Sequence, residues 1–251
     1  MIMIKSIKIF NDNLVWLIYK KNKCIIIDPG LSEPIIKKLE KNKLVPILIL
    51  ITHMHYDHIN GVSNLVKNYP KIKVFTPKII KKVCKKNQII VKRKNIFIFN
   101  KLLYIFPTPG HTKFDLSYYS YPYLFCGDTL FSAGCGNTKD GCSKKLYRSL
   151  KKIQFLPKET IFFNSHQYTL SNLKFTKKIY QKNPLIEEYL DFLKKNHKKN
   201  IINYSFMKFE KKINLFLRTH KKEVREIINY WYFSEKEEEF FCNLRKIKDQ
   251  Y

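Results

Sequence analysis

Side chains that commonly bind metal ions are concentrated directly after the apolar run of residues 46–51. His53, His55, Asp57 and His58 follow this run within the next seven positions. Residues two apart in an extended segment point to the same side, so the imidazoles of His53 and His55 face the same way. Asp57 and His58 come at the turn into a following helix and can reach a point beside that pair. Imidazole and carboxylate together suit Zn²⁺, Fe or Mn²⁺, so the spacing predicts a metal site at the end of a strand.

Three later apolar runs also end close to a side chain that can bind a metal. They lead to His111, Asp128 and His166. Taken singly, each is weak evidence, because a lone histidine after a strand is more often a hydrogen-bonded structural residue. Together with the first group they place five of the seven histidines at predicted strand ends, which favours a metal site over a polar surface loop.

The texture of the chain changes near residue 170. Short β-branched runs predict strands over 15–19, 24–28, 45–52, 74–76, 89–91, 96–99, 102–107, 116–119, 123–126 and 160–164, with helices over 32–42 and 60–68. Helical spacing follows over 175–182, 185–198, 222–231 and 235–246. We therefore expect an α/β layered domain over residues 1–170 and a helical region over residues 171–251.

The chain is strongly basic, with 48 Lys and Arg against 20 Asp and Glu and a formal net charge of +28. Such a surplus could bind nucleic acid by neutralising phosphates. The lysine pairs are, however, spread from Lys20-Lys21 to Lys221-Lys222. Ile, Asn, Phe and Tyr are also abundant throughout, which is typical of a compositional bias. We therefore interpret the basic charge as a result of this compositional bias, and a nucleic-acid partner is the alternative interpretation.

The sequence also indicates where the protein acts. Residues 1–10 carry Lys5 and Lys8 and have no long apolar segment, so we expect no signal peptide. The most apolar stretch, residues 44–52, is shorter than the ~20 residues of a membrane-spanning helix. The six cysteines lack C-x-x-C spacing and are expected to be reduced thiols. We predict a soluble, cytoplasmic monomer with no membrane partner.

The ligand-rich segments at 52–58, 110–112, 127–129 and 165–168 resemble the metal-site motifs of the metallo-β-lactamase superfamily. The resemblance is finer to one branch, the glyoxalase II (hydroxyacylglutathione hydrolase) family. It is carried by residues 12–17, 27–30, 125–136, 166–175, 214–219 and 244–249. It thus spans nearly the whole chain, including a helical tail that other branches lack. It implies an αββα sandwich with the metals at one edge of its two sheets, followed by a C-terminal helical appendage.

The resemblance implies a pair of divalent metal ions, with Zn²⁺ expected first and Fe or Mn²⁺ as alternatives. The ligands that it implies are His53, His55 and His111 for one ion, Asp57, His58 and His166 for the other, and Asp128 as the bridge. Asp57 and Asp128 would also take part in catalysis, because they neutralise part of the metal charge and hold the nucleophile in line.

Glutathione contacts are implied as well. Family members use a basic and an aromatic residue after a G-C-G motif, the Tyr of an H-x-Y-T motif, and an Arg and a Lys near the C-terminus. The last three correspond to Tyr168, Arg245 and Lys248. Residues 137–141 depart from the family pattern, and we expect Lys139 to restore the missing charge. The alternatives are a packed core position for Tyr168 and a solvated basic tail for Arg245 and Lys248.

The activity that the resemblance implies is hydrolysis of S-D-lactoylglutathione to D-lactate and glutathione by a metal-bridging hydroxide. This is the second step of methylglyoxal detoxification, and its partner is a small-molecule glutathione thioester. The alternatives are a superfamily nuclease acting on RNA, a persulfide dioxygenase, and a nucleic-acid-binding protein with a vestigial metal site. The complete ligand set argues against a vestige, because an idle site should have lost at least one ligand.

Overall fold

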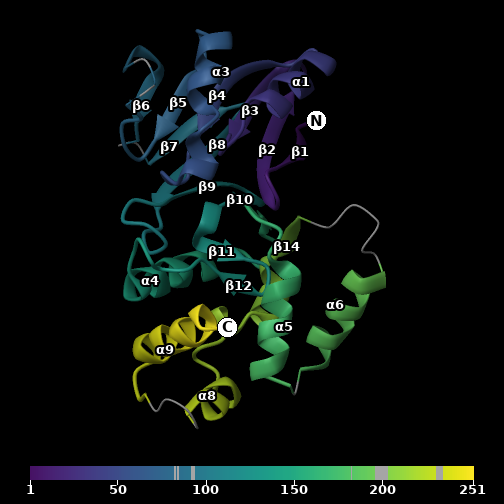
Figure 1. Ribbon diagram of the computed structural model, residues 1–251, viewed down its shortest axis with the longest axis vertical. Helices are drawn as coiled ribbons and strands as arrows, with labels where there is room; N and C mark the ends of the chain where they lie inside the picture. Colours follow the sequence, from purple (N-terminus) through teal and green to yellow (C-terminus); the bar gives the residue numbers. More distant parts are fainter. Residues whose placement is uncertain (82, 84, 92–93, 182, 196–202, 230–233) are drawn as a thin grey trace. The chain divides into compact units, whose positions relative to one another are not determined.

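The computed structural model describes residues 1–81, 83, 85–91, 94–181, 183–195, 203–229 and 234–251. These residues form two compact units (Figure 1). The first comprises Met1–Pro107 and Phe114–Ser120, and the second comprises Thr108–Lys113 and Tyr121–Tyr251. The boundary predicted near residue 170 falls inside the second unit and stays a prediction. Among the described residues, none of the helices combines the length and the apolar character needed to span a bilayer.

The first unit contains a sheet in the order β1-β2-β3-β4-β5-β6. Its strands are β1 (Met3–Ile9), β2 (Asn13–Lys20), β3 (Lys23–Ile27), β4 (Val45–Leu50), β5 (Lys73–Thr76) and β6 (Gln88–Ile90). Strands β1 to β3 pair antiparallel, whereas β3 to β6 pair parallel. Parallel neighbours need a crossover. Helix α1 (Glu33–Lys41) supplies one between β3 and β4, and α3 (Val62–Asn68) another between β4 and β5.

An apolar core forms where α1 and α3 cover one face of this sheet, as Figure 1 shows. Residues of the core that are fully buried include Leu17, Ile26, Ile35, Leu39, Ile49 and Leu65. Each large aliphatic side chain buried in this way stabilises the fold by about 1.5–3 kcal/mol. The segment that follows β4 is therefore anchored on well-packed elements.

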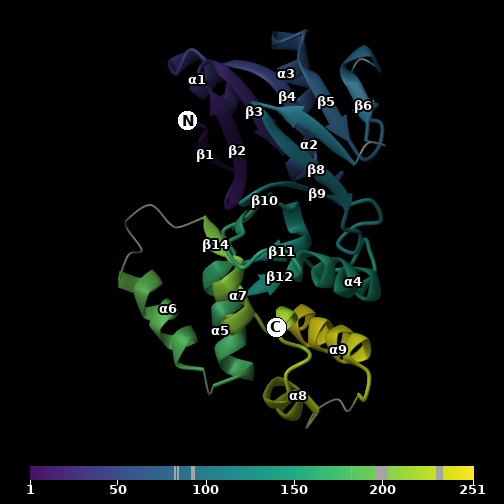
Figure 2. The same cartoon turned by 180° about the vertical axis from the view of Figure 1, so that it is seen from behind.

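Three antiparallel strands complete the first unit, with β7 labelled in Figure 1 and β8 and β9 also in Figure 2. They are β7 (Asn95–Ile98), β8 (Lys101–Pro107) and β9 (Leu116–Ser120). Strand β9 is tied to the chain that leaves β4, because the Tyr118 hydroxyl donates to the carbonyl of Ile51 at 2.7 Å. The Leu116 amide likewise donates to the carbonyl of Thr52 at 2.8 Å. These bonds hold the start of the first ligand segment.

The second unit has its own strands. They are β10 (Tyr123–Phe125), β11 (Leu130–Phe131), β12 (Gly134–Cys135), β13 (Ile161–Phe163) and β14 (Tyr204–Phe206). Strand β13 pairs parallel with β10 and antiparallel with β14, while β11 and β12 form a separate two-stranded hairpin.

The helical elements of the second unit follow the strands or lie between them. They are η2 (Gly127–Thr129), α4 (Ser143–Gln154), α5 (Thr169–Ile179), α6 (Pro184–Lys195), α7 (Met207–Ile213), η3 (Leu215–Leu217), α8 (Lys222–Asn229) and α9 (Glu237–Asp249). Both views place α4 beside α9, and the rings of Tyr147 and Phe241 meet there at 5.5 Å. The salt bridge between Lys151 and Glu237, at 2.6 Å, joins the same two helices.

Most predicted elements are confirmed to within a few residues. The helices predicted over 175–182, 185–198, 222–231 and 235–246 correspond to α5, α6, α8 and α9, although positions 182, 196–198 and 230–231 lie outside the described residues. Strands β1, β11, β12 and β14, helices α4 and α7, and the single helical turn of residues Tyr56–Ile59 were not predicted. Helix α4 left a readable signal, because its buried Leu146, Leu150 and Ile153 recur at helical spacing.

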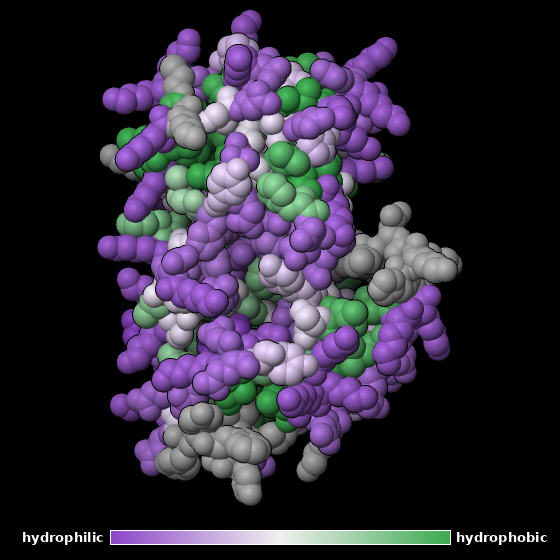
Figure 3. Space-filling view, viewed as in Figure 1, coloured by the Kyte–Doolittle hydropathy of each residue, from purple (hydrophilic) through white to green (hydrophobic). Residues whose placement is uncertain are grey.

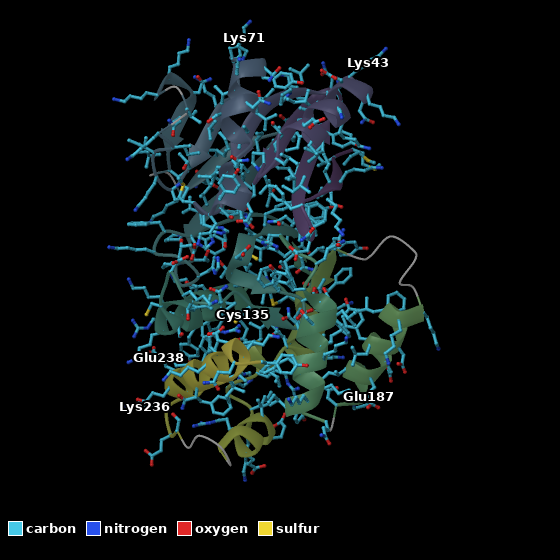
Figure 4. All side chains as sticks on the ribbon, viewed as in Figure 1. Lys43, Lys71, Cys135, Glu187, Lys236 and Glu238 are labelled. Atoms are coloured by element: carbon cyan, nitrogen blue, oxygen red, sulfur yellow. The ribbon has the colours of Figure 1, made fainter. Side chains whose placement is uncertain are left out.

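Hydrophilic residues are distributed over both units on the face seen in Figure 3. Lys43 and Lys71 in the first unit and Lys236 in the second, which Figure 4 labels, illustrate this spread. This distribution agrees with the compositional bias favoured from the sequence.

Candidate metal centre

The first unit presents its ligand-type side chains where the chain leaves β4. His53 and His55 lie in the extended segment after the strand, and Asp57 and His58 lie in the single turn of α2 (Tyr56–Ile59). The Nε2 atom of His53 lies 3.1 Å from the Nδ1 atom of His55. Two nitrogens that are each about 2.0–2.1 Å from a tetrahedral Zn²⁺ lie about 3.3 Å apart. The spacing of the two imidazoles therefore fits a shared metal ion.

Asp28 organises the outer side of this group, although its carboxylate is only 4% exposed. It accepts a hydrogen bond from the backbone amide of Thr52 at 2.8 Å and another from the Thr52 hydroxyl at 2.6 Å. The Nδ1 atom of His58 lies 3.0 Å from the same carboxylate. A carboxylate favours the proton on the nearer imidazole nitrogen, so Nε2 of His58 keeps its lone pair for a metal.

Thr52 fixes the orientation of the neighbouring histidine in a similar way. Its hydroxyl proton is donated to Asp28, so its oxygen can accept from the Nδ1 atom of His53, 3.0 Å away. That hydrogen bond leaves Nε2 of His53 as the nitrogen that faces His55. The tautomer of His53 thus follows from a chain of hydrogen bonds that begins at a buried aspartate.

Asp57 is held by neighbours in the first unit. The Asn13 side-chain amide donates to Oδ2 of Asp57 at 2.5 Å, and the Nε2 atom of His58 lies 3.6 Å from that oxygen. Gly30 is required beside it, because a Cβ atom at this position would overlap the backbone carbonyl of Asp57. The Asp57 carboxylate is therefore held by its neighbours in the fold.

The second unit contributes three more ligand types, arranged around one carboxylate. The Oδ2 atom of Asp128 lies 3.5 Å from Nε2 of His111 and 3.5 Å from Nε2 of His166. Its other oxygen, Oδ1, accepts a hydrogen bond from the Ser165 hydroxyl at 2.8 Å. An oxygen that lies between two imidazole nitrogens at such distances fits a carboxylate that serves two metal ions.

A backbone carbonyl determines the tautomer of His111. Its Nδ1 atom lies 2.8 Å from the carbonyl oxygen of Asn137, which can only accept a hydrogen bond. The proton therefore resides on Nδ1, and Nε2 faces Asp128. Each unit thus contains an imidazole whose outer nitrogen is hydrogen-bonded, His53 to Thr52 and His111 to Asn137, and the donor types of both units fit divalent metal ions.

Sequence reasoning missed the residues that hold these ligands. They are Asn13, Asp28, Thr52, Asn137 and Ser165. All but Asn137 belong to segments that carry the resemblance, which was the available signal. Nothing in the sequence shows which ligand each would contact, because the partners are brought together only by the fold.

The residues predicted to bind glutathione all lie in the second unit. The half-buried ring of Tyr168 stacks on His166, with centroids 4.7 Å apart. Lys139 is exposed on the loop after Gly136. The ammonium of Lys248 lies over the rings of Phe175 and Tyr251, and burial lowers the pKa of this group.

Arg245 is buried, with 4% of its surface exposed. Its guanidinium donates to the carbonyls of Cys135 at 3.1 Å and Gly136 at 3.4 Å, and pairs with Asp249 at 2.9 Å. Figure 4 labels Cys135, beside α9. These contacts give Arg245 a structural role in holding the chain at Cys135 and Gly136, and its contact with glutathione stays a prediction.

Two family models together match nearly the whole chain. Residues 10–85 and 87–166 match the metallo-beta-lactamase superfamily, and residues 167–251 match the hydroxyacylglutathione hydrolase C-terminus. A hydroxyacylglutathione hydrolase of Buchnera aphidicola subsp. Baizongia pistaciae is 45% identical over 244 residues, or 97% of each chain. One from Cronobacter sakazakii is 39% identical over 251 residues, or 99% of each chain.

Solved structures agree at the level of the fold. The crystal structure of the BLEG-1 B3 metallo-beta-lactamase has a TM-score of 0.64 and 23% identity, and the match covers 86% of this chain and 99% of that one. At this identity the likeness shows the fold alone. The predicted α/β class, a metallo-β-lactamase fold with a C-terminal helical region, is confirmed.

Proposed function

The chain belongs to the hydroxyacylglutathione hydrolase family of the metallo-β-lactamase superfamily, and from this premise we infer its activity. It is a metal-dependent hydrolase that cleaves S-D-lactoylglutathione to D-lactate and glutathione, the second step of methylglyoxal detoxification. The observation that carries this conclusion is the 45% identity to a hydroxyacylglutathione hydrolase along 97% of both chains.

We propose that the ligand-type side chains of the two units hold a pair of divalent metal ions. The ligands proposed are His53, His55 and His111 for one ion, Asp57, His58 and His166 for the other, and Asp128 for both. We propose Zn²⁺, because the spacing of the His53 and His55 nitrogens suits tetrahedral coordination. When bound, two such ions lower the pKa of a shared water, so that hydroxide is available at neutral pH.

The proposed catalytic residues are Asp57 and Asp128. Each carboxylate is held in place by a neighbour. Asn13 donates to Oδ2 of Asp57, and Ser165 donates to Oδ1 of Asp128, the oxygen opposite the one that faces His111 and His166. The role of the two carboxylates is to neutralise metal charge and to keep the attacking oxygen in line with the thioester carbonyl. The leaving thiolate is a good leaving group, so no side chain is required as a general acid.

We propose that glutathione is recognised by Tyr168, Lys139, Lys248 and Arg245. Tyr168 is supported by its ring, which stacks on His166 and so lies beside a proposed ligand. Lys139 and Lys248 offer ammonium groups that can pair with the two carboxylates of glutathione. Arg245 already pairs with Asp249, so a substrate carboxylate would have to share its guanidinium.

We propose that the protein acts as a monomer in the cytoplasm. The described cysteines, Cys24, Cys126, Cys135, Cys142 and Cys242, are free thiols. Free thiols suit a reducing compartment.

The test is cleavage of S-D-lactoylglutathione by the purified protein, with the metal content measured on the same sample. Asp128→Ala removes a carboxylate that would be a ligand to both ions and is expected to lower kcat by roughly 100-fold or more. Asp191→Ala, at an exposed aspartate paired with Lys194, is the matched control and should leave the rate unchanged. A protein that carries two metal ions and leaves this thioester intact would refute the proposal. RNA would then be the next substrate to test.

A further inference from the structure

The β11–β12 hairpin is enclosed by side chains of the second unit. We call residues 130–136 the ligand hairpin. Its backbone groups are bonded by Asn164 (to Ser132 N), Asn172 (to Ser132 O), Glu210 (to Ala133 N), Asn214 (to Phe131 O and Gly134 O) and Arg245 (to Cys135 O and Gly136 O). These side chains come from the end of β13 and from α5, α7, α9 and the turn after α7. The C-terminal helical region thus holds this hairpin through hydrogen bonds to its backbone.

One end of the ligand hairpin leads to a proposed metal ligand, and the other leads to the carbonyl that orients a second one. Asp128 lies two residues before the hairpin, and Asn137, whose carbonyl accepts from His111 at 2.8 Å, follows it. Gly136 packs closely against both groups. A Cβ atom there would overlap the Asp128 carbonyl and would lie 3.1 Å from Nδ1 of His111. A small shift of the hairpin would therefore move the Asp128 carboxylate and change the hydrogen bond that orients His111.

Among the side chains that bond to the hairpin backbone in the described part of the chain, Glu210 carries the carboxyl group. It lies in α7 and is fully buried. Its Oε2 atom accepts from the amide of Ala133 at 2.8 Å and from the Asn214 side chain at 3.1 Å, and its Oε1 atom accepts from the Ser205 hydroxyl at 2.7 Å. Asn214 in turn donates to two hairpin carbonyls, so Glu210 supports the hairpin both directly and through Asn214.

The residue that Glu210 contacts has a strained backbone conformation. Ala133 has a φ of +58°, a left-handed conformation that residues with a Cβ atom rarely adopt. Such a conformation persists only when the surrounding structure enforces it. The hydrogen bond from the Ala133 amide to Glu210 provides that enforcement at the tip of the hairpin.

We propose that Glu210 is a positioning residue for the metal centre. Through Ala133 and Asn214 it holds the ligand hairpin, and the hairpin sets the positions of Asp128 and of the carbonyl that orients His111. The link to catalysis rests on the proposed function, whereas the link to ligand geometry does not. A role confined to general stability would leave the hairpin and the metal affinity no more affected than any other buried substitution in this unit.

The experiment compares Glu210→Ala and Glu210→Gln in the full chain. Removal of the carboxyl should weaken retention of Zn²⁺ against a chelator about 10-fold, the lower end of the effect of outer contacts on metal sites. Hydrogen exchange should accelerate over residues 130–137. If the thioester is cleaved, kcat should fall with little change in KM. Glu210→Gln should restore all three properties, because its amide oxygen can accept from Ala133 and Asn214 while its NH₂ donates to Ser205.

Leu190→Ala, at a buried residue of α6, is the matched control for a loss of stability. Zn²⁺ retention by Glu210→Ala that equals retention by Leu190→Ala would overturn the proposal. If Glu210→Ala does not fold, Glu210→Asp replaces it, because its carboxyl is one methylene too short to reach Ala133. Unchanged exchange and retention in that variant would also overturn the proposal. Metal retention and exchange need no substrate, so they decide this inference even if the wild-type protein fails to cleave the thioester.

Discussion

Glu210 also makes a measurable contribution to the pH dependence of folding. Burial raises the pKa of its carboxyl from 4.5 to about 7, although the bonds from Ser205, Ala133 and Asn214 act in the opposite direction. Tyr189 on α6 is the other titratable group in this environment, and burial and the nearby Glu210 raise its pKa further above neutrality. Glu210 is therefore the group that titrates here near neutral pH.

The sign of the effect follows from linkage. A carboxyl whose pKa is higher in the folded state binds its proton more tightly there, so protonation stabilises the fold. The stabilisation is fully present below about pH 4.5 and is lost as the pH rises through about 7. At 1.36 kcal/mol for each pKa unit, a rise from 4.5 to about 7 amounts to about 3 kcal/mol in total. Between about pH 5 and about pH 8 the expected change is about 2.5 kcal/mol.

Glu210→Gln isolates this contribution, because glutamine occupies nearly the same volume, satisfies the same partners and does not titrate. We expect the free energy of unfolding of the variant, minus that of the wild type, to increase by about 2.5 kcal/mol from about pH 5 to about pH 8. Urea unfolding of the metal-free proteins measures this difference, and all other titrating groups cancel in it. A difference that varies by less than about 0.5 kcal/mol across that range would refute the reasoning.

Further predictions concern the outer contacts of the metal centre and its substrate. Asp28→Asn exchanges one carboxylate oxygen for an NH₂ group, so the side chain cannot keep all three contacts to the Thr52 amide, the Thr52 hydroxyl and His58. Zn²⁺ should therefore bind roughly 10-fold to 100-fold more weakly in a chelator competition, and equal affinity would contradict the assigned role. Gly136→Ala forces a Cβ atom onto the Asp128 carbonyl and should lower both metal content and kcat. The exposed substitution Asp191→Ala is the control, and equal metal content in the two variants would contradict this expectation. Tyr168→Phe removes only a hydroxyl and should raise KM for S-D-lactoylglutathione several-fold, by roughly 1 kcal/mol of binding, while kcat stays constant; a fall in kcat alone would contradict a binding role.

The sequence by itself determined the chemistry of the site and most of the fold. Ligand-type residues follow apolar runs, and both kinds of signal are local, so they can be read without knowing which strands pair. The alternation and spacing that predicted β2 to β10 are local in the same sense. Strand β14 is only three residues long, and β1 is interrupted by Lys5, Ser6 and Lys8, so neither has a clear apolar pattern. Both are recognised as strands from their pairing with β13 and β2 in the structure.

Only the tertiary structure decided which residues hold the ligands in place. Asn13 reaches Asp57 across 44 positions of the sequence, and Glu210 reaches Ala133 across 77. The first contact is a part-buried hydrogen bond and the second is a buried one, and a single hydrogen bond leaves no periodic pattern along the chain. A buried polar group must find a partner, but the sequence does not say which one, because the partner is selected by the packing of strands and helices that are distant in sequence.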